Sequence, residues 1–453
     1  MSTLISKYNV VGPRYTSYPT VPYWDQESFS LRAWKETLQK SFHESNTSKG
    51  ISLYIHLPFC ESMCTFCGCN KRITKNHDVE MPYIKSVIKE FIMYYELFKE
   101  KPKIQQLHLG GGTPTFFSSE NLRLLLSGIF TVALKAKNCE LSFEGHPNNT
   151  TKEHLKTLSD QGFNRVCYGV QDYNDIVQKA INRVQPYENV LRATTEARAE
   201  NYASVGHDII YGLPFQTQDD VINTINKTIT LYPDRIAFYS YAHVPWMKGN
   251  GQRGFKEQNL PTANQKRLQY EIGKEMLVNA GYVEIGMDHF ALKTDNLYVA
   301  QQNGSLHRNF MGYNSSKTQV MIGLGVSAIS DSWYSFVQNV KNLEIYQNLV
   351  NDNILPVFRG HILTQEDLII RKHILNLMCT FETSWTDDDL FFTELPGVLI
   401  KIKELENDGL IEIGSKKIIV TEKGRPFVRN VCLPFDLRLQ RKKPKTQLFS
   451  MTV

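Results

Sequence analysis

The chain has 453 residues, of which 42% are hydrophobic and 21% are charged. This balance is ordinary for a globular protein and excludes a disordered or fibrous chain. The formal charge of +5, from 51 Lys and Arg against 46 Asp and Glu, is too small in a chain of this length to predict a nucleic-acid partner. Because no signal-type apolar core follows Met1–Ile5 and no run of about 18 apolar residues occurs, we expect a cytoplasmic protein without a membrane span.

Residues 1–49 are expected to form an N-terminal arm. Within it, Gly12–Thr20 combines turn formers with aromatic side chains and has little helical or strand period. A segment of this kind usually lies on the surface. The alternative is a lid that carries Arg14 toward an anionic ligand.

Residues 50–245 alternate short β-rich runs with amphipathic helical patterns, which predicts right-handed crossovers and a parallel sheet. The expected strands are Ile51–Leu57, Ile104–Leu109, Glu140–Glu144, Asn164–Val170, Ser204–Tyr211 and Arg235–Tyr241. The expected helices are Met81–Phe98, Glu120–Ala136, Lys152–Asp160, Tyr187–Asn201 and Asp219–Leu231. Capping-box spacings at Thr150–Glu153 and Thr217–Asp220 indicate two of the helix starts.

These units fit either an open doubly wound sheet or an incomplete barrel, and three features favour the barrel. A group of cysteines follows the first expected strand, Gly110–Gly112 follows the second, and Glu144 ends the third. In a barrel, the loops after the carboxyl ends of the strands carry the chemistry. The predicted fold is therefore α/β, a partial (β/α)6 barrel of the TIM type.

The rest of the chain is expected to form a barrel extension near the substrate, residues 246–340, and a mostly helical C-terminal domain, residues 341–453. Thr364–Asp367 indicates a helix start. Further on, Leu410–Ile413 and Lys417–Thr421 read as a hairpin whose two-residue turn, Gly414-Ser415, has glycine first. Helices followed by such a hairpin suggest a winged-helix-like module.

Four of the eight cysteines, Cys60, Cys64, Cys67 and Cys69, fall within ten residues. The other four, Cys139, Cys167, Cys379 and Cys432, are scattered in apolar surroundings, where a cysteine is usually a small core residue. A disulfide framework would suit a short secreted chain, which this is not.

The first three clustered cysteines form a C-x3-C-x2-C motif. Three thiolates on one loop repel one another unless a cation neutralises them, and a four-iron cluster held by three cysteines does so while leaving one iron open. Zinc is the alternative, although a structural zinc site usually takes paired ligands from separate loops. Three packed cysteines without a metal are the remaining possibility.

This motif, together with the glycine-rich Leu109–Pro114, resembles the radical S-adenosylmethionine (SAM) superfamily. The resemblance implies a 4Fe–4S cluster whose open iron binds the methionine part of SAM, so that one electron releases a 5′-deoxyadenosyl radical. The hard chemistry then belongs to the cofactors, and the protein binds and orients them.

More closely, nearly the whole chain is similar to the bacterial oxygen-independent coproporphyrinogen III oxidases. These enzymes convert two propionates of coproporphyrinogen III to vinyl groups and give protoporphyrinogen IX for haem synthesis. Cys69 and the long arm separate the chain from the related haem-binding chaperones, which stay an alternative, as does a radical SAM enzyme for another tetrapyrrole. The matching segments are Gly12–Thr20, Tyr54–Cys60, Phe66–Lys71, Tyr168–Asp172, Ile210–Pro214, Tyr241–Pro245, Gly286–Phe290, His307–Phe310 and Gly325–Ile329.

The resemblance also implies roles for individual residues. The cluster ligands would be Cys60, Cys64 and Cys67. The family binds two SAM molecules, and the positions that match the first are Tyr54, Gly111, Glu144 and Ile329. The positions that match the second are Phe66, Gly112, Thr113, Gln171, Arg183, Asp208 and Ala242.

The substrate carries about four propionate charges, so cationic side chains should line its site. The candidates for substrate binding are Arg14, Tyr15, His289 and Arg308. We expect a monomer reduced by a low-potential donor such as flavodoxin or ferredoxin. Two segments depart from the family pattern: Gly145–Asn148 lacks the family's acid and arginine, and Gly206-His207 precedes Asp208.

Overall fold

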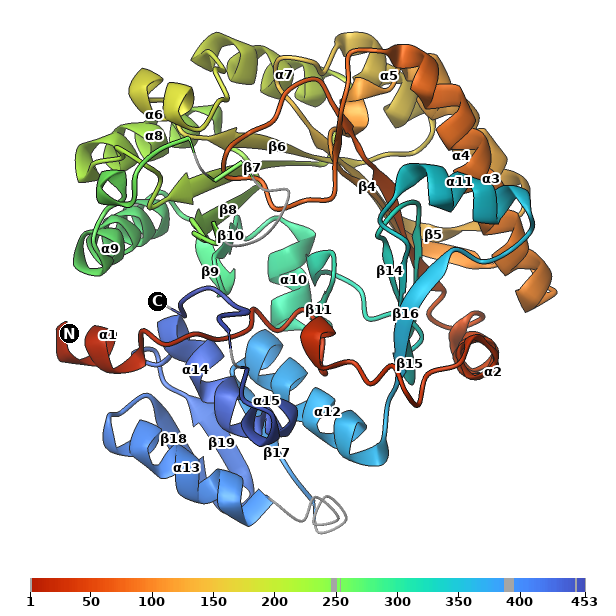
Figure 1. The fold of residues 1–453 in the computed structure, drawn as a ribbon. Helices are drawn as coiled ribbons and strands as arrows, with labels where there is room; N and C mark the ends of the chain where they lie inside the picture. The colour runs from red at the N-terminus through yellow and green to blue at the C-terminus, as the bar shows by residue number, and fades with distance from the viewer. Residues whose placement is uncertain (1, 246–250, 253, 387–394, 445, 453) are drawn as a thin grey trace.

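The computed structural model describes residues 2–245, 251–252, 254–386, 395–444 and 446–452. Its main element is a sheet of twelve strands in the order β16-β15-β14-β13-β1-β4-β5-β6-β7-β8-β10-β9 (Figure 1). The parallel strands are β13 (Val320–Leu324), β1 (Ile51–Leu57), β4 (Lys103–Gly111), β5 (Leu134–Gly145), β6 (Arg165–Gln171), β7 (Ser204–Tyr211) and β8 (Arg235–Ser240). The antiparallel strands are β14 (Ile329–Asp331), β15 (Ser335–Asn339), β16 (Val357–Ile362), β9 (Val283–Gly286) and β10 (His289–Ala291).

The sheet curves into the expected partial barrel. All six expected strands are present, and β13, which the sequence analysis did not predict, adds another parallel strand beside β1. The edge strands β16 and β9 are not paired with each other in the described part of the chain, so the barrel stays open.

Helices cover the outer face of the sheet (Figure 1). They are α3 (Glu80–Phe98), α4 (Ser119–Thr131), α5 (Lys152–Asp160), α6 (Asp175–Ala180), α7 (Tyr187–Ala199), α8 (Gln218–Leu231) and α9 (Ala263–Asn279). Outward-facing Leu53 and Leu107 join Phe91 of α3 and Leu125 of α4 in one fully buried core. Burying such side chains contributes about 1.5–3 kcal/mol each.

Two boundaries differ from the sequence prediction. Helix α4 ends at Thr131, before the expected Ala136, because β5 already begins at Leu134. Helix α5 is capped by Thr151, which forms a capping box with His154, so the expected Thr150 start is wrong by one residue. The boxes predicted at Thr217 and Thr364 are confirmed.

The inner face of the barrel is polar, because side chains alternate between the two faces of a strand. Near its floor, Arg235 lies 2.7 Å from Asp295 and 3.0 Å from Glu140, which also pairs with Arg165 at 3.2 Å. Asp295 caps α10 (Asn296–Gln302), a helix inside the curve of the sheet (Figure 1). Arg165 and Arg235 begin β6 and β8, so this network lies away from the carboxyl edge of the strands.

The C-terminal part builds a second core from helices and a three-stranded antiparallel sheet in the order β17-β19-β18. Gly414 pairs with Lys417 in the ladder, so the hairpin turn is Ser415-Lys416 and the predicted Gly414-Ser415 turn is wrong. The elements of the C-terminal part are α12 (Gln365–Thr380), β17 (Glu382–Ser384), α13 (Leu395–Asn407), β18 (Ile411–Gly414), β19 (Lys417–Val420), α14 (Val428–Cys432) and α15 (Leu437–Arg441).

Gly12–Thr20 of the N-terminal segment is mostly buried and does not form the expected surface segment. Tyr15 and Tyr18 are 2% and 1% exposed and belong to the C-terminal core. Helix α1 (Ser2–Tyr8) lies beside the C-terminal part (Figure 1). A further helix that the sequence analysis missed, α2 (Leu31–Ser45), packs on the sheet through Trp34 and Phe42.

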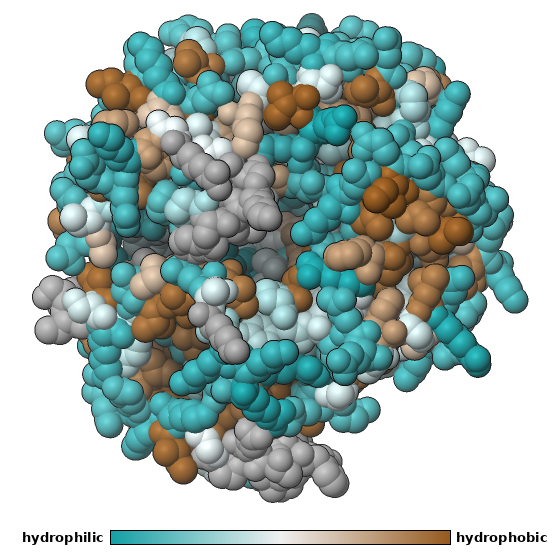
Figure 2. Space-filling view, viewed as in Figure 1, coloured by the Kyte–Doolittle hydropathy of each residue, from teal (hydrophilic) through white to brown (hydrophobic). Residues whose placement is uncertain are grey.

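Hydrophilic side chains cover most of the viewed face, and apolar ones gather around α11 (Leu343–Asn351) and its neighbouring strands (Figure 2). Ile345 and Phe358 are more than half exposed there. None of the helices in the described ranges is long and apolar enough to cross a bilayer.

Candidate active site

A cavity of about 440 Å³ lies at the carboxyl edge of the barrel strands. Its walls come from the loops after β1 and β4 and from the ends of β5, β6 and β7, as a barrel fold predicts. The predicted residues that line it are Cys60, Cys64, Phe66, Cys67, Gly111, Gly112, Thr113, Glu144, Gln171, Arg183 and Asp208. Most of the positions inferred for the cluster and for SAM therefore lie in one space.

The three cysteines of the motif contact three different neighbours. The Cys60 thiol lies 3.3 Å from Thr113 Oγ1, and Arg183 Nη1 lies 3.8 Å from Cys64 Sγ. A hydrogen bond from Cys69 lowers the pKa of Cys67 to about 6. Short parallel pairing of β2 (Phe59–Cys60) with β3 (Arg72–Ile73) closes the loop that carries them.

These thiols fit a cluster in their chemistry and in their spread. In the described part of the chain, no three His, Cys, Asp or Glu side chains are placed to hold a single metal ion. A 4Fe–4S cluster takes each thiolate on a different iron, so its ligands need not converge on one point. Cys60, Cys64 and Cys67 would hold such a cluster, with one iron left for another ligand.

Two glycines shape the wall beside the cysteine loop. Gly111 has a φ of +118°, and a Cβ there would lie 2.7 Å from the His56 ring. A Cβ on Gly112 would lie 2.6 Å from the backbone of Pro58. Only glycine lets the two segments approach this closely, and the resulting backbone wall is open to a ligand in the cavity.

Glu144 stands at the end of β5 beside that wall. His108 Nε2 lies 3.3 Å from its Oε1, and the Gly111 N–H donates to its Oε2 at 3.4 Å. Burial alone would raise the pKa of Glu144, but the hydrogen bonds to His108 and Gly111 outweigh it and the pKa is lowered. An ionised carboxylate in this position can accept hydrogen bonds from an ammonium group.

Arg183 and Asp208 form a further pair of ionisable groups on another wall of the cavity. Arg183 Nη2 donates to the Gly169 carbonyl at 2.7 Å, and the Cys167 thiol donates to Asp208 at 3.2 Å. Burial raises the pKa of Asp208 to about 7. Arg183 Nε is buried without a hydrogen-bond partner in the described structure. These groups suit a ligand that carries both a carboxylate and an amine.

Three predicted cofactor positions lie outside this cavity. The Tyr54 hydroxyl lies 3.1 Å from His56 Nδ1, and the Tyr54 ring lies behind Gly110. Ile329 packs beside Phe336 on β15. Ala242 lines a neighbouring cavity of about 310 Å³ between the barrel and the arm.

The substrate candidates are also separate from the cluster loop. Arg14 donates to Asp288 at 3.2 Å and to the Ser240 carbonyl at 3.1 Å. Arg308 donates to the Arg14 carbonyl at 3.2 Å. Burial lowers the pKa of His289 to about 3, so its ring is neutral in this structure, and its role in substrate binding stays a prediction. Tyr15 is fixed in the C-terminal core, where its hydroxyl donates to Asp436 at 3.3 Å.

Sequence analysis missed some cavity residues. Cys167, taken as a core cysteine, lines the cavity, whereas Cys379 and Cys432 are buried as predicted. The signal was present in the alternation of β6, where Val166 and Val170 face the core and Cys167 and Gly169 face the cavity. The two segments that depart from the family pattern differ in position. His146 lines the cavity, while His207 is buried against Thr194.

Residues 54–228 match the family model of the radical SAM superfamily. A partial barrel with a cysteine triplet after β1 and a glycine-rich loop after β4 thus defines a radical SAM protein. The chain is 37% identical to the oxygen-independent coproporphyrinogen III oxidase of Synechocystis sp., over 99% of this chain and 97% of that protein. It is 37% identical to the Escherichia coli protein of the same name, over 99% and 98% of the two chains.

Among solved structures, the coproporphyrinogen III oxidase from Escherichia coli, described as a radical SAM enzyme, superimposes with a TM-score of 0.88. It is 35% identical and covers 96% of this chain and 98% of its own. The chain belongs to the family of oxygen-independent coproporphyrinogen III oxidases.

Proposed function

We propose that this protein catalyses the reaction of its family, the oxidative decarboxylation of two propionates of coproporphyrinogen III to the vinyl groups of protoporphyrinogen IX. One observation carries the proposal: the cysteine triplet, the glycine wall and Glu144 line the same cavity of a chain that matches the family over its full length. The barrel at residues 50–245 would hold the cofactors, the extension at 246–340 would complete the substrate site, and the arm at 1–49 and the C-terminal domain at 341–453 would cover it.

Each part of the cavity has a task in this reaction. When bound, the cluster and SAM supply a carbon radical that removes a hydrogen atom from the substrate. Glu144 would accept hydrogen bonds from the amino group of the first SAM, and the backbone at Gly111 would lie against it. Arg183 and Asp208 would bind the carboxylate and the amine of a second SAM. These roles follow from the opposite charges of the partners.

Exclusion of water and of foreign C–H groups matters more here than acid–base catalysis, because a carbon radical reacts with almost any neighbour. The arm supports this exclusion. Its Tyr15 and Tyr18 are buried, and its Arg14 is fixed to Asp288 and Ser240 at the barrel edge. A substrate in the barrel mouth would therefore be enclosed between the barrel and the C-terminal core.

The electron donor would dock where the cysteine loop reaches the surface. Lys71 donates to the carbonyls of Cys67 and Cys69, each at 3.4 Å. The side chain of Arg72 is 59% exposed and pairs with the exposed Glu344 at 3.3 Å. This cationic loop suits an acidic low-potential protein such as flavodoxin or ferredoxin. We further infer a cytoplasmic monomer.

The experiment compares wild type with Cys64→Ser, and with Cys139→Ser as the control. After anaerobic reconstitution, Cys64→Ser should lose iron, labile sulfide and turnover together, while Cys139→Ser keeps all three. Turnover that survives in Cys64→Ser would refute the proposal. The competing chaperone function predicts stable haem binding by wild type without release of CO2 or 5′-deoxyadenosine.

A further inference from the structure

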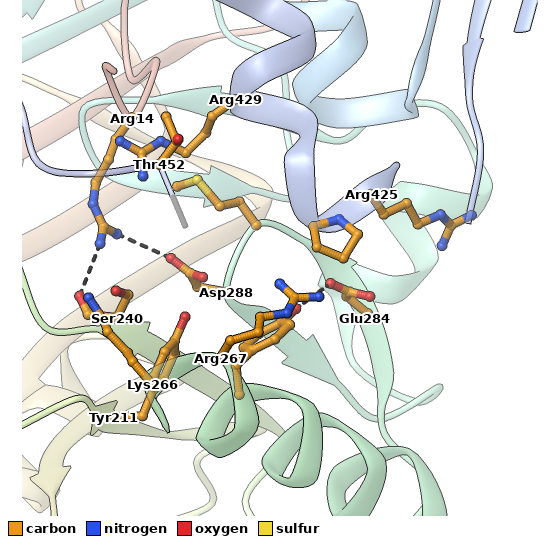
Figure 3. A pocket seen from close by; sticks show the side chains of 13 residues that line it. Arg14, Tyr211, Ser240, Lys266, Arg267, Glu284, Asp288, Arg425, Arg429 and Thr452 are labelled. Carbon is orange, nitrogen blue, oxygen red and sulfur yellow. Dashed lines mark hydrogen bonds and ion pairs between the residues drawn. The ribbon is translucent and has the colours of Figure 1, made fainter. Parts of the chain in front are cut away.

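A small cavity of about 40 Å³ lies between the barrel edge, α9 and the C-terminal part (Figure 3). Ser240 at the end of β8 and Tyr211 at the end of β7 form its barrel side, and Arg429 of α14 forms the opposite side. It shares no lining residue with the active-site cavity. By volume it has room for about three water-sized groups.

Cationic side chains dominate the lining. Five of them, Arg14, Lys266, Arg267, Arg425 and Arg429, face two carboxylates, Glu284 and Asp288. Figure 3 shows Arg14 directed at Asp288 and Ser240, with Lys266, Arg267 and Arg429 around the same space. The guanidinium of Arg425 points away from it, toward Glu422. The lining therefore carries an excess of positive charge.

Both carboxylates already have partners. Asp288 accepts from Arg14 at 3.2 Å. Glu284 accepts from the Tyr270 hydroxyl at 2.9 Å and from Lys274 at 2.5 Å. Two other cations are paired with carboxylates outside the lining, Arg425 with Glu422 and Arg267 with Glu271. Among the described residues, Lys266 and Arg429 therefore have no carboxylate partner.

Lys266 and Arg429 are held by backbone oxygens instead. Lys266 donates to the Tyr241 carbonyl at 2.9 Å. Arg429 donates to the Pro13 and Met451 carbonyls, each at 2.9 Å, and to Gly12. Carbonyl groups orient a cation but carry no net charge, so they do not balance it. Burial, with the neighbouring Arg14, lowers the pKa of Lys266 to about 8.

One more cation is incompletely satisfied. Arg267 is 9% exposed and pairs with Glu271 through Nη2, yet its Nε is buried without a hydrogen-bond partner in the described structure. A buried guanidinium N–H without an acceptor is costly even when the charge itself is paired. A small anion in the cavity would offset this cost.

The larger cavity next to this one indicates which molecule could supply the anion. Arg14 lines both this cavity and the larger one of about 310 Å³, which is also lined by Ala242 and by the arm. A group that extends from the larger space past Arg14 would enter the small one. Its size admits a carboxylate but not a pyrrole ring.

We propose that this cationic cavity binds a carboxylate, and that the carboxylate is a propionate of the tetrapyrrole substrate. The inference rests on the proposed function and deepens it. Because the cavity shares no residue with the cluster site, it holds a propionate other than the one that reacts. It would anchor the ring while another propionate faces the radical.

The test measures binding of coproporphyrin III, the air-stable oxidised form of the substrate, by fluorescence titration of the cluster-loaded protein. Lys266→Met should weaken binding about tenfold or more, because it removes a charged hydrogen-bond donor. Asp288→Asn should strengthen binding severalfold, because it removes a competing negative charge. Lys227→Met, on the outer helix α8, is the matched control and should bind like wild type.

Two outcomes would overturn the inference. Equal affinities of wild type, Lys266→Met and Asp288→Asn would show that no carboxylate of the porphyrin enters the cavity. Thermal stabilisation of wild type by inorganic phosphate that is lost in Lys266→Met, with unchanged porphyrin affinity, would show a site for a free anion. In both cases the proposed function still stands, whereas wild type that binds no coproporphyrin at all would refute the function and the inference together.

Discussion

The Glu144 carboxylate lies 3.3 Å from the ring nitrogen Nε2 of His108, one strand away on the inner face of the barrel. The register that pairs His108 of β4 with Ser142 of β5 places the two side chains together at the carboxyl edge. Since the pKa of Glu144 is lowered, the carboxylate is ionised at neutral pH. It is the only acid that we assign to the first SAM molecule.

Replacing Glu144 with Gln should weaken SAM binding by about tenfold or more, since it removes one charge-assisted hydrogen bond. The iron content should not change, because Glu144 is not a cluster ligand. Equilibrium binding of SAM to the reconstituted protein measures the effect. Glu153→Gln, an exposed position on α5, is the control. A wild-type affinity in Glu144→Gln would contradict the assignment.

Gly111→Ala should abolish SAM binding, because its Cβ would meet the His56 ring at 2.7 Å. Gly281→Ala provides the matched control. Gly281 also has a positive φ, +93°, but a Cβ there has no neighbour within 4 Å. Both variants should lose about 1–2 kcal/mol of stability from backbone strain, while only Gly111→Ala should lose SAM affinity. Equal SAM affinities in the two variants would show that the glycine wall is not part of the site.

Arg438 and Asp367 form a bidentate pair, with Nε–Oδ1 and Nη2–Oδ2 distances of 2.7 Å, that ties α15 to α12. Asp367 is fully buried, so Arg438→Ala would remove its arginine partner and leave only the hydrogen bonds with Thr364 and His361. The loss should cost about 3–5 kcal/mol. Arg441→Ala breaks an exposed pair with Glu366 and should cost less than about 1 kcal/mol. Denaturant unfolding of both variants tests the difference, and equal losses would contradict it.

Glu90 should make stability depend on pH. Burial raises its folded pKa to about 7, although it accepts hydrogen bonds from Gly325 N–H and from Tyr346 and Asn339. Between its unfolded pKa, near 4.3, and about 7 the folded state holds a proton that the unfolded state releases. The contribution of Glu90 is therefore full below this window and falls by up to about 4 kcal/mol as pH rises through it.

Glu90→Gln should remove this pH-dependent part. Other buried carboxyl and imidazole groups titrate in the same range, so the informative quantity is the difference between wild type and variant. Unfolding free energies at about pH 5 and about pH 8 supply it. A difference that does not change with pH would mean that the buried carboxylate stays ionised throughout.

The sequence was most informative where chemistry and local periodicity coincide. The cysteine triplet, Gly111 and Glu144 were located at one edge because strand–helix alternation fixes where parallel strands end. Strand β13 and helix α2 could not be predicted in this way. Each owes its place to partners that are distant along the chain, Val320 to Ile51 and Trp34 to the core of the sheet.

The charges and positions of the substrate-binding residues were the hardest features to predict from the sequence. His289 was expected to be cationic, yet burial beside Tyr239 and Tyr313 keeps it neutral. Lys266 and Arg429 were not considered, because nothing in their local sequence shows that α9 and α14 face each other across Arg14. The charge of such groups depends on their burial in the folded protein, which the sequence pattern does not predict.

Decarboxylation of coproporphyrinogen III by this protein, with a cluster and SAM, can be measured directly. The most direct test supplies anaerobic, reconstituted protein with SAM, a low-potential reductant and coproporphyrinogen III, and quantifies the products. We expect protoporphyrinogen IX, CO2 and 5′-deoxyadenosine to form together. Recovery of all the coproporphyrinogen III from protein that contains iron and sulfide would contradict it.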